Sequence, residues 1–415
     1  MPHDCSSGTA PLRHRLGGLI AVGTLLMATG CVWVDHTPFG GRPGELKTAF
    51  GHEDPLEITS SVHEVEPRLD GNLRVPRFSE RSRVFVWEDP VRNTIMGAEI
   101  GGSAKEFAPS RGSWQIDWTA DGRKFLLTDL ISAPQQGPTT TPYRATLYSL
   151  NGDAPVVIGE MSDSRGAIMP DGSGLTYTRL VNEPKSGSMM PAPDVHNRDP
   201  KRLMIRLPSQ AETEEAVLNG PGLGFWSHDA QHYAYLEHRD GNPINGLDLR
   251  VYDRQTKTSA LRYHIESDDL QKVMNGLSWS ADNTLWFAQA CQVQASASIA
   301  VSSIPVDGKA VTLSVVPISL EEGETISSLR LSPDQTRVSF ETQKVVTLTD
   351  GTGKVTGPRS SGLVVASLKT GKTRRLTPRG QFLSWLPGGD ELIAKTGYGP
   401  DPRYYRIAVP RAEEI

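Results

Sequence analysis

One short string in the sequence has the residue types of a phosphate site. Thr370-Gly371-Lys372-Thr373 matches the last residues of a phosphate-binding loop, but the fifth residue before Gly371 is Ala366. The loop chemistry needs a glycine there and a helix afterwards, because backbone amides and the helix N-terminus hold the phosphate. Here the string joins two strand-like stretches, so the sequence predicts a hairpin turn and no phosphate site.

Histidines gather at only one place, where His228, His232 and His238 occur within eleven residues. The pattern places His228 in a turn and the other two at opposite ends of one strand, so the three side chains do not converge on a metal. The pair Asp268 and Asp269 is predicted to open a short helix reaching Met274, after Ser267. We therefore expect no metal site and no cofactor.

The cysteines indicate processing rather than catalysis. Cys31 directly follows the uncharged segment 16–30, which is preceded by Arg13 and Arg15. The string Met27-Ala28-Thr29-Gly30-Cys31 resembles the lipobox of bacterial lipoproteins, which implies a signal peptide over 1–30 and a lipid on the Cys31 thiol. An uncleaved transmembrane anchor running through Val34 is the alternative. Both readings place the body outside the cytoplasm, and Cys291 is left as a small buried residue.

Composition and net charge limit the kinds of partner that this protein is expected to bind. The chain has 415 residues, 37% hydrophobic, with 40 Gly and 30 Pro and a net charge of −5, which favours a turn-rich globular protein and gives no electrostatic reason to bind nucleic acid. One basic run, from Lys372 to Arg379, is read as a solvated outer strand. We expect no nucleic-acid partner.

A repeat organises the body. It consists of an apolar strand ending in a bulky residue, a small or polar pair, an Asp, and a second apolar strand. The bulky positions are Trp118, Ile168, Trp226, Trp279, Leu331 and Trp385, separated by 50, 58, 53, 52 and 54 residues. Phe78 heads a weaker copy, which raises the count from six to seven. Units of about 50 residues with room for four short strands are typical of propeller blades.

These repeats, with turns such as Trp279-Ser280-Ala281-Asp282 and the hairpin at residues 370–377, are similar to TolB-type, WD-repeat-like propeller repeats. The resemblance implies an all-β fold, a seven-bladed β-propeller of four-stranded antiparallel blades over 55–415 (six blades without the weak copy), after a lipidated linker over 31–54. No segment between Cys31 and Leu56 is long enough for the N-terminal domain that TolB carries. The turn Asp residues and glycines are explained by backbone geometry.

The ends of the chain are predicted to close the ring. The last repeat has strands near 382–385, 391–395 and 404–409 but lacks a fourth, and the stretch Leu56 to Val65 alternates well enough to supply it. Closure removes the open sheet edge.

The long connections between strands are predicted to lie on one face of the propeller. In an up-and-down blade the second-to-third and fourth-to-first connections emerge together. Insertions there span 131–142, 181–200, 237–245, 344–360 and 397–403, whereas the other turns are tight. We expect an unidentified protein, peptide or saccharide to bind this long-loop face, which carries Met189, Met190, His196, His238, Arg239, Tyr398 and Arg403.

No nucleophile, base or metal constellation is evident, and no Gly-x-Ser-x-Gly elbow occurs. The sequence therefore favours a lipid-anchored binding scaffold of the cell envelope over an enzyme. The alternative is a hydrolase or lyase that acts on peptides or oligosaccharides in the central channel.

Overall fold

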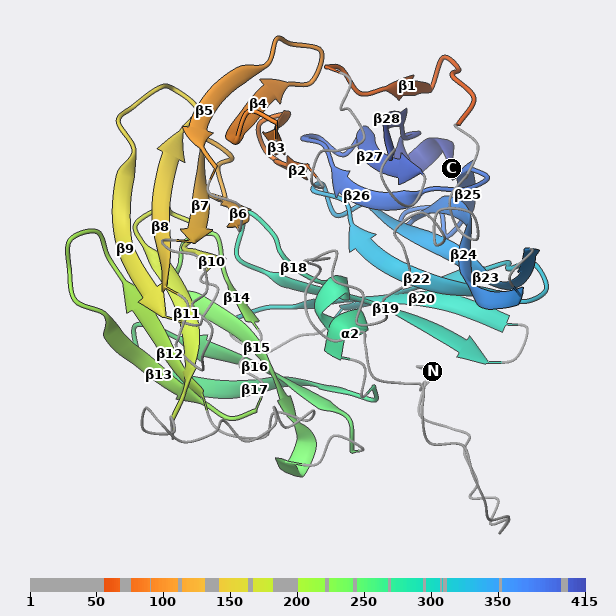
Figure 1. Ribbon diagram of the computed structural model, residues 1–415. Coiled ribbons are helices and arrows are strands. Elements are labelled where there is room, and N and C mark those ends of the chain that lie inside the picture. Colours follow the sequence, from red (N-terminus) through yellow and green to blue (C-terminus); the bar gives the residue numbers. More distant parts are fainter. Residues whose placement is uncertain are drawn as a thin grey trace.

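The computed structural model describes residues 56–415 except 68–75, 90, 111–113, 131–141, 163–166, 182–200, 221–223, 242–244, 268–269, 294–295, 307, 309–311, 351–352 and 397–401. Within these residues the chain forms seven four-stranded antiparallel sheets arranged as the blades of one propeller (Figure 1). The predicted fold class and blade count are confirmed.

Each blade contributes four strands in chain order, from the inner strand at the ring axis to the outer strand. Blade 1 has β2 (Arg77–Phe78), β3 (Val84–Asp89), β4 (Thr94–Glu99) and β5 (Lys105–Pro109). Blade 2 has β6 (Trp114–Trp118), β7 (Lys124–Leu130), β8 (Pro142–Ser149) and β9 (Val156–Ser162). Blade 3 has β10 (Ala167–Ile168), β11 (Leu175–Leu180), β12 (Lys201–Arg206) and β13 (Thr213–Leu218). Blade 4 has β14 (Gly224–Trp226), β15 (His232–His238), β16 (Leu247–Asp253) and β17 (Thr258–Ile265).

The remaining three blades follow the same plan. Blade 5 has β18 (Leu277–Trp279), β19 (Leu285–Val293), β20 (Ser296–Ile304) and β21 (Thr312–Ile318). Blade 6 has β22 (Glu324–Leu331), β23 (Arg337–Asp350), β24 (Gly353–Ser367) and β25 (Thr373–Thr377). Blade 7 has β26 (Gln381–Trp385), β27 (Glu391–Thr396) and β28 (Arg403–Ala408) from the C-terminus, and β1 (Val62–Glu64) from the N-terminal side.

Ring closure occurs as the sequence predicts. Strand β1 pairs antiparallel with β28, and Val62 lies opposite Ile407 (Figure 1). Leu56, which is buried, donates its backbone N–H to the hydroxyl of Tyr405 at 3.2 Å. The last blade is therefore complete only when the N-terminal strand is in place.

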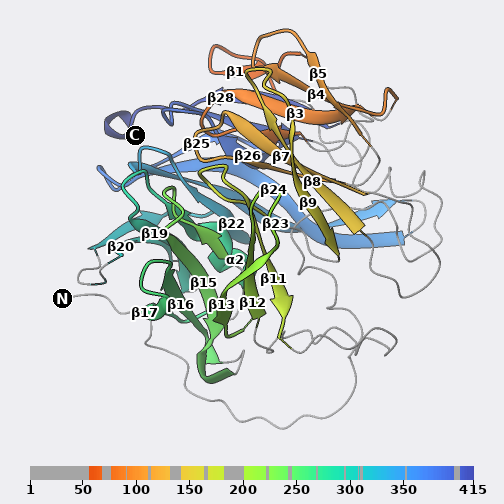
Figure 2. The same ribbon diagram turned by 90° about the vertical axis from the view of Figure 1, so that its left-hand side faces the viewer.

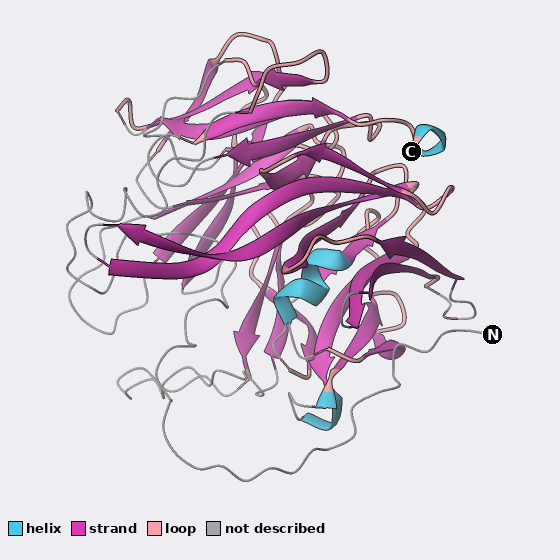
Figure 3. Cartoon of the chain, turned by 90° about the vertical axis from the view of Figure 1, so that its right-hand side faces the viewer, coloured by secondary structure: helices cyan, strands magenta, loops and turns pink. Residues whose placement is uncertain are grey.

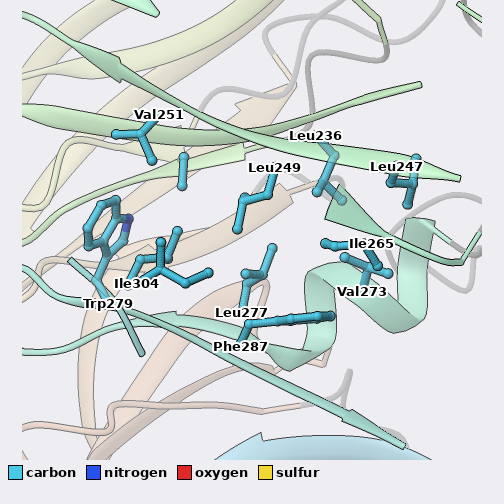
Figure 4. Packing of buried hydrophobic residues seen from close by; sticks show 12 residues of the cluster. Leu236, Leu247, Leu249, Val251, Ile265, Val273, Leu277, Trp279, Phe287 and Ile304 are labelled. Atoms are coloured by element: carbon cyan, nitrogen blue, oxygen red, sulfur yellow. The ribbon is translucent and has the colours of Figure 1, made fainter. Parts of the chain in front are cut away.

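Hydrophobic cores lie between neighbouring blades and contain the bulky residue of each repeat. Trp279 of blade 5 packs with Leu249 and Val251 of blade 4 (Figure 4), and its indole N–H donates to the carbonyl of Phe225 at 3.2 Å. Trp385 likewise donates to the carbonyl of Arg330 in blade 6. Each of these two tryptophans thus ties one inner strand to the preceding blade, and the burial of apolar surface between blades stabilises the ring.

Helix is scarce, as Figure 3 shows. The one α-helix among the described residues is α2 (Leu270–Gly276), two residues later than the predicted segment, and short 3₁₀ turns occupy Arg239–Gly241 and Ala412–Glu414. No helix in the described ranges is long and apolar enough to cross a membrane.

One sequence expectation is wrong in detail. The sequence predicts a loop over 344–360, but β23 and β24 continue their pairing to Asp350 and Gly353, so the segment is a long hairpin (Figure 2). Strand-compatible residues such as Val345 and Val346 sit opposite Pro358 and Gly357. The alternation of this segment suits a two-stranded ribbon as well as a loop, and only the register reveals it.

Candidate ligand pocket at the channel mouth

The tight turns between the first and second strands of blades 2, 4, 5 and 6 share one hydrogen-bond pattern. A hydroxyl donates to the Asp two residues later, from Thr119 to Asp121 at 2.6 Å and from Ser332 to Asp334 at 2.5 Å. The same hydroxyl accepts the N–H of the returning strand, that of Lys124 or of Arg337. Positive φ follows the Asp, as at Gln335 (φ 59°). The repeated Asp is therefore a turn-forming residue, as predicted from the sequence.

These turns surround a cavity of about 390 Å³. Its lining comes from six of the seven blades: residues 76–81, 118–120, 228, 278–279, 331–333, 335 and 383–384. Segments so distant in sequence meet only at the ring axis, at the end where the inner strands finish. The cavity is thus the mouth of the central channel on the tight-turn face, opposite the long-loop face.

Two blades depart from the repeat at this mouth. The second residue of the turn is Ala or Pro in five blades: Ala120, Pro170, Ala281, Pro333 and Pro387. Blades 3 and 7 have Met169 and Leu386 in place of the hydroxyl residue, and blade 7 has Gly388 in place of the Asp. At the second position of the turn, blade 1 has Glu80 and blade 4 has His228, and both line the cavity. Blade 1 also has Arg81 in place of the Asp. The titratable groups of the mouth therefore arise where the sequence breaks its own repeat.

Enclosure in the channel shifts the proton affinity of both groups. Glu80 is exposed and lines the cavity, and desolvation by the surrounding ring raises its pKa, while the charges of Arg330 and Arg81 lower it. Burial lowers the pKa of His228, and the Arg81 charge adds to this effect while Asp229 opposes it. His228 is therefore neutral at pH 7, and Glu80 holds its proton more firmly than an ordinary glutamate.

Two arginines, Arg77 and Arg81, line the mouth. Within the described part of the chain, neither Arg77 nor Arg81 makes a side-chain hydrogen bond or ion pair, and Nε of Arg77 is buried with no acceptor. A third arginine, Arg330, lies close to Glu80, but its guanidinium donates to neutral oxygens, including Oδ1 of Asn275 at 2.8 Å. Arg81 is exposed and Arg77 is half-buried, so their one donor that is both buried and without an acceptor is Nε of Arg77, and a buried donor left unpaired is unusual.

A buried carboxylate lies on the second strand of blade 6. Oε1 of Glu341 accepts the backbone N–H of Phe382 at 2.7 Å, and burial raises its pKa to about 7, although Phe382 and Arg330 oppose the shift. Opposite it, β22 has a bulge in which Ser328 adopts φ 53°. Bulges of this kind often redirect side chains near functional sites.

The residues predicted for the long-loop face are only partly described. His238 is buried at the end of β15, and Arg239 pairs with Asp248 at 3.3 Å and with Glu266 at 3.0 Å. Arg403 begins β28 in blade 7, three blades from Arg239, so these residues do not form one site. The remaining predicted residues lie outside the described part of the chain: Cys31, Met189, Met190, His196 and Tyr398.

Known proteins relate to this chain only at the level of fold. The sequence matches no protein-family model and no curated protein. An acylaminoacyl peptidase in complex with a chloromethyl ketone superposes with a TM-score of 0.51 at 12% identity, over 82% of this chain and 51% of that one. The chain thus spans about half the length of that peptidase. The β-propeller domain of Myceliophteria thermophila Cps50 (Swd1) gives 0.50 at 12% identity, over 84% of this chain and 100% of that domain.

TolB from Acinetobacter baumannii is also similar, with a TM-score of 0.38 at 11% identity, over 81% of this chain and 79% of TolB. At these identities the similarity is one of fold, and the same fold carries unrelated functions. Function has to be argued from the cavity itself.

Proposed function

We propose that this chain is a ligand-binding propeller of the bacterial cell envelope, anchored by lipid on Cys31, and that its ligand occupies the cavity at the channel mouth. The observation that supports this most strongly is the pair of cavity-lining arginines, Arg77 and Arg81, neither of which makes an ion pair or side-chain hydrogen bond with a described residue. Nε of Arg77 is buried without an acceptor, and a protein retains such a donor at a cost in stability when a ligand supplies the missing acceptor.

The anchor follows from the sequence alone. The uncharged segment 16–30 before Cys31 supports cleavage and lipidation, and two acyl chains would hold the protein at the membrane surface. The linker after Cys31 leads toward β1, which belongs to blade 7. Tethering of this kind presents a propeller to partners in the envelope.

A hydrolase or lyase acting on peptides or oligosaccharides is the second candidate. It is favoured by the presence of Glu80 and His228 in one cavity, because burial raises the pKa of the carboxyl and lowers that of the imidazole. Such opposed shifts suit a general acid and a general base. Glu80→Gln separates the two candidates: an enzyme loses turnover of envelope peptides or oligosaccharides, whereas a binding protein shows no turnover before or after the change.

The repeat offers a matched pair for testing the binding function. Ala120 and Ala281 occupy equivalent turn positions in blades 2 and 5, but only Ala120 is among the residues that line the cavity. Ala120→Trp should fill the cavity, and Ala281→Trp should place the same side chain outside it. The measurement is photo-crosslinking of ligand to each intact lipoprotein in cells.

We expect the wild type and Ala281→Trp to capture the same ligand and Ala120→Trp to lose it. A third variant replaces Val181 to Pro200 with a short Gly-Ser bridge and so removes an insertion of the long-loop face. Capture that persists in Ala120→Trp and disappears in the bridged variant would refute the pocket and support the long-loop face.

A further inference from the structure

Several polar side chains at the channel mouth already make hydrogen bonds within the protein, whereas others make none. The hydroxyls of Thr119 and Ser332 donate within their own turns, and that of Ser384 donates to the carbonyl of Trp385 at 2.9 Å. Oγ of Ser79 accepts the backbone N–H groups of residues 81 and 82. Few hydroxyls therefore remain for a sugar ring, whose many hydroxyl groups each need a partner.

Two of the cavity-lining groups that make no hydrogen bond or ion pair with a described residue are arginines. Arg77 and Arg81 are donors only, since a guanidinium has no acceptor atom. The matching ligand group is acceptor-only and anionic, and a planar carboxylate fits guanidinium donors through paired N–H···O bonds.

One acceptor stands among these donors. The carboxyl group of Glu80 makes no hydrogen bond to any described residue, and it lies within the electrostatic reach of Arg81 and Arg330. A ligand that carries an N–H close to its carboxylate would satisfy Glu80 and the arginines together. The last residue of a peptide has this arrangement of one amide N–H and one carboxylate.

Much of the remaining lining is apolar, beside the polar residues His228, Ser278 and Gln335. Pro76, Phe78, Leu331, Pro333 and Leu383 contribute to the wall of the cavity. Surfaces of this kind bind hydrocarbon side chains, with a few polar groups that fix orientation. They would contact the side chain next to a peptide carboxylate.

We propose that the mouth of the channel binds the C-terminal end of a peptide with an apolar last residue, Arg77 and Arg81 holding the carboxylate and Glu80 accepting the last peptide N–H. This inference rests on the proposed function, since it identifies the ligand of the same cavity. On this proposal, blade 1 departs from the repeat at Glu80 and Arg81 because these residues recognise the C-terminal end of a peptide.

The test uses the intact protein and an array of octapeptides that end in Ala, Val, Leu or Phe. Each peptide is synthesised with a free carboxylate and with a carboxamide, and a further amidated set carries Glu at its last position. We expect binding to the free-acid peptides, reduced at least 10-fold by amidation, and no recovery in the amidated Glu set. Recovery there would show that any carboxylate suffices and would overturn the assignment to a chain end.

Variants then locate the contact. Arg77→Gln should weaken binding of the free acids at least 10-fold and leave amide binding unchanged, and Arg77→Lys should recover part of the loss. Arg92→Gln is the control, because Arg92 lies in the same blade, exposed, between β3 and β4 on the other face. Thermal unfolding of each variant checks that it is folded.

Two results separate the inference from the function on which it rests. Equal binding of acids and amides that is lost in Ala120→Trp refutes carboxylate recognition but keeps the pocket. Peptide binding that survives Ala120→Trp, or no peptide binding at all, refutes this inference; survival also counts against the cavity as the binding site.

Discussion

Replacing Glu341 by Gln should change how the stability of the propeller depends on pH. Glu341 is only 4% exposed, and burial raises its pKa from 4.5 to about 7. Between these two values the unfolded chain has lost the proton that the folded protein keeps. Rising pH therefore destabilises the wild type across this window, and the loss is complete above the folded pKa.

The magnitude follows from the size of the shift. At about 1.4 kcal/mol per pH unit, the ionised form costs about 3 kcal/mol at high pH, of which about 2 kcal/mol is lost between pH 5 and pH 8. Glutamine does not ionise, and its Oε1 can still accept the N–H of Phe382. We therefore expect the free energy of unfolding of Glu341→Gln, relative to wild type, to rise by about 2 kcal/mol from pH 5 to pH 8.

Urea unfolding followed by tryptophan fluorescence at the two pH values measures this difference, and other titrating groups cancel in the comparison with wild type. Glu322→Gln, at an exposed position, is the control and should show no such change. A difference between Glu341→Gln and wild type that is the same at pH 5 and pH 8, or that falls with pH, would refute the assignment of a buried, protonated carboxyl.

Three further predictions concern closure, the pocket and the anchor. Deleting Leu56 to Val65 removes β1, so hydrogen exchange should speed up most in β27 and β28; protection kept there and lost in other blades would contradict closure. Arg77→Met removes a buried N–H that has no acceptor and should raise the free energy of unfolding by about 1 kcal/mol, measured by urea unfolding, and a loss of stability would indicate a structural role. Cys31→Ser should abolish metabolic labelling with a fatty acid, and unchanged labelling would rule out the lipid anchor.

The sequence predicts those parts of the fold that depend on local chemistry. The spacing of Trp118, Trp226, Trp279 and Trp385 reflects one bulky residue per blade interface, and each turn Asp satisfies its own backbone. The closing strand is predictable because the last repeat lacks a partner that the residues before the first repeat can supply. Periodicity and turn preference are sufficient for these conclusions.

The cavity could not be predicted in the same way. Glu80, His228 and Pro333 are far apart in the chain and approach each other only because the ring closes. The loop lengths predict a binding site on the opposite face, but His238 is buried there and Arg239 is already paired with Asp248. The repeat itself contains a usable signal. Only blades 1 and 4 have a titratable residue, Glu80 or His228, at the second position of the turn, where the other five blades have Ala or Pro.

The most direct measurement of the central claim is hydrogen–deuterium exchange of the intact protein with and without its captured ligand. Binding at the channel mouth predicts slower exchange in residues 76–81, 118–120 and 331–333, which line the cavity from three blades. Protection confined to the connection between β15 and β16 and to the start of β28, with the mouth unchanged, would contradict the account.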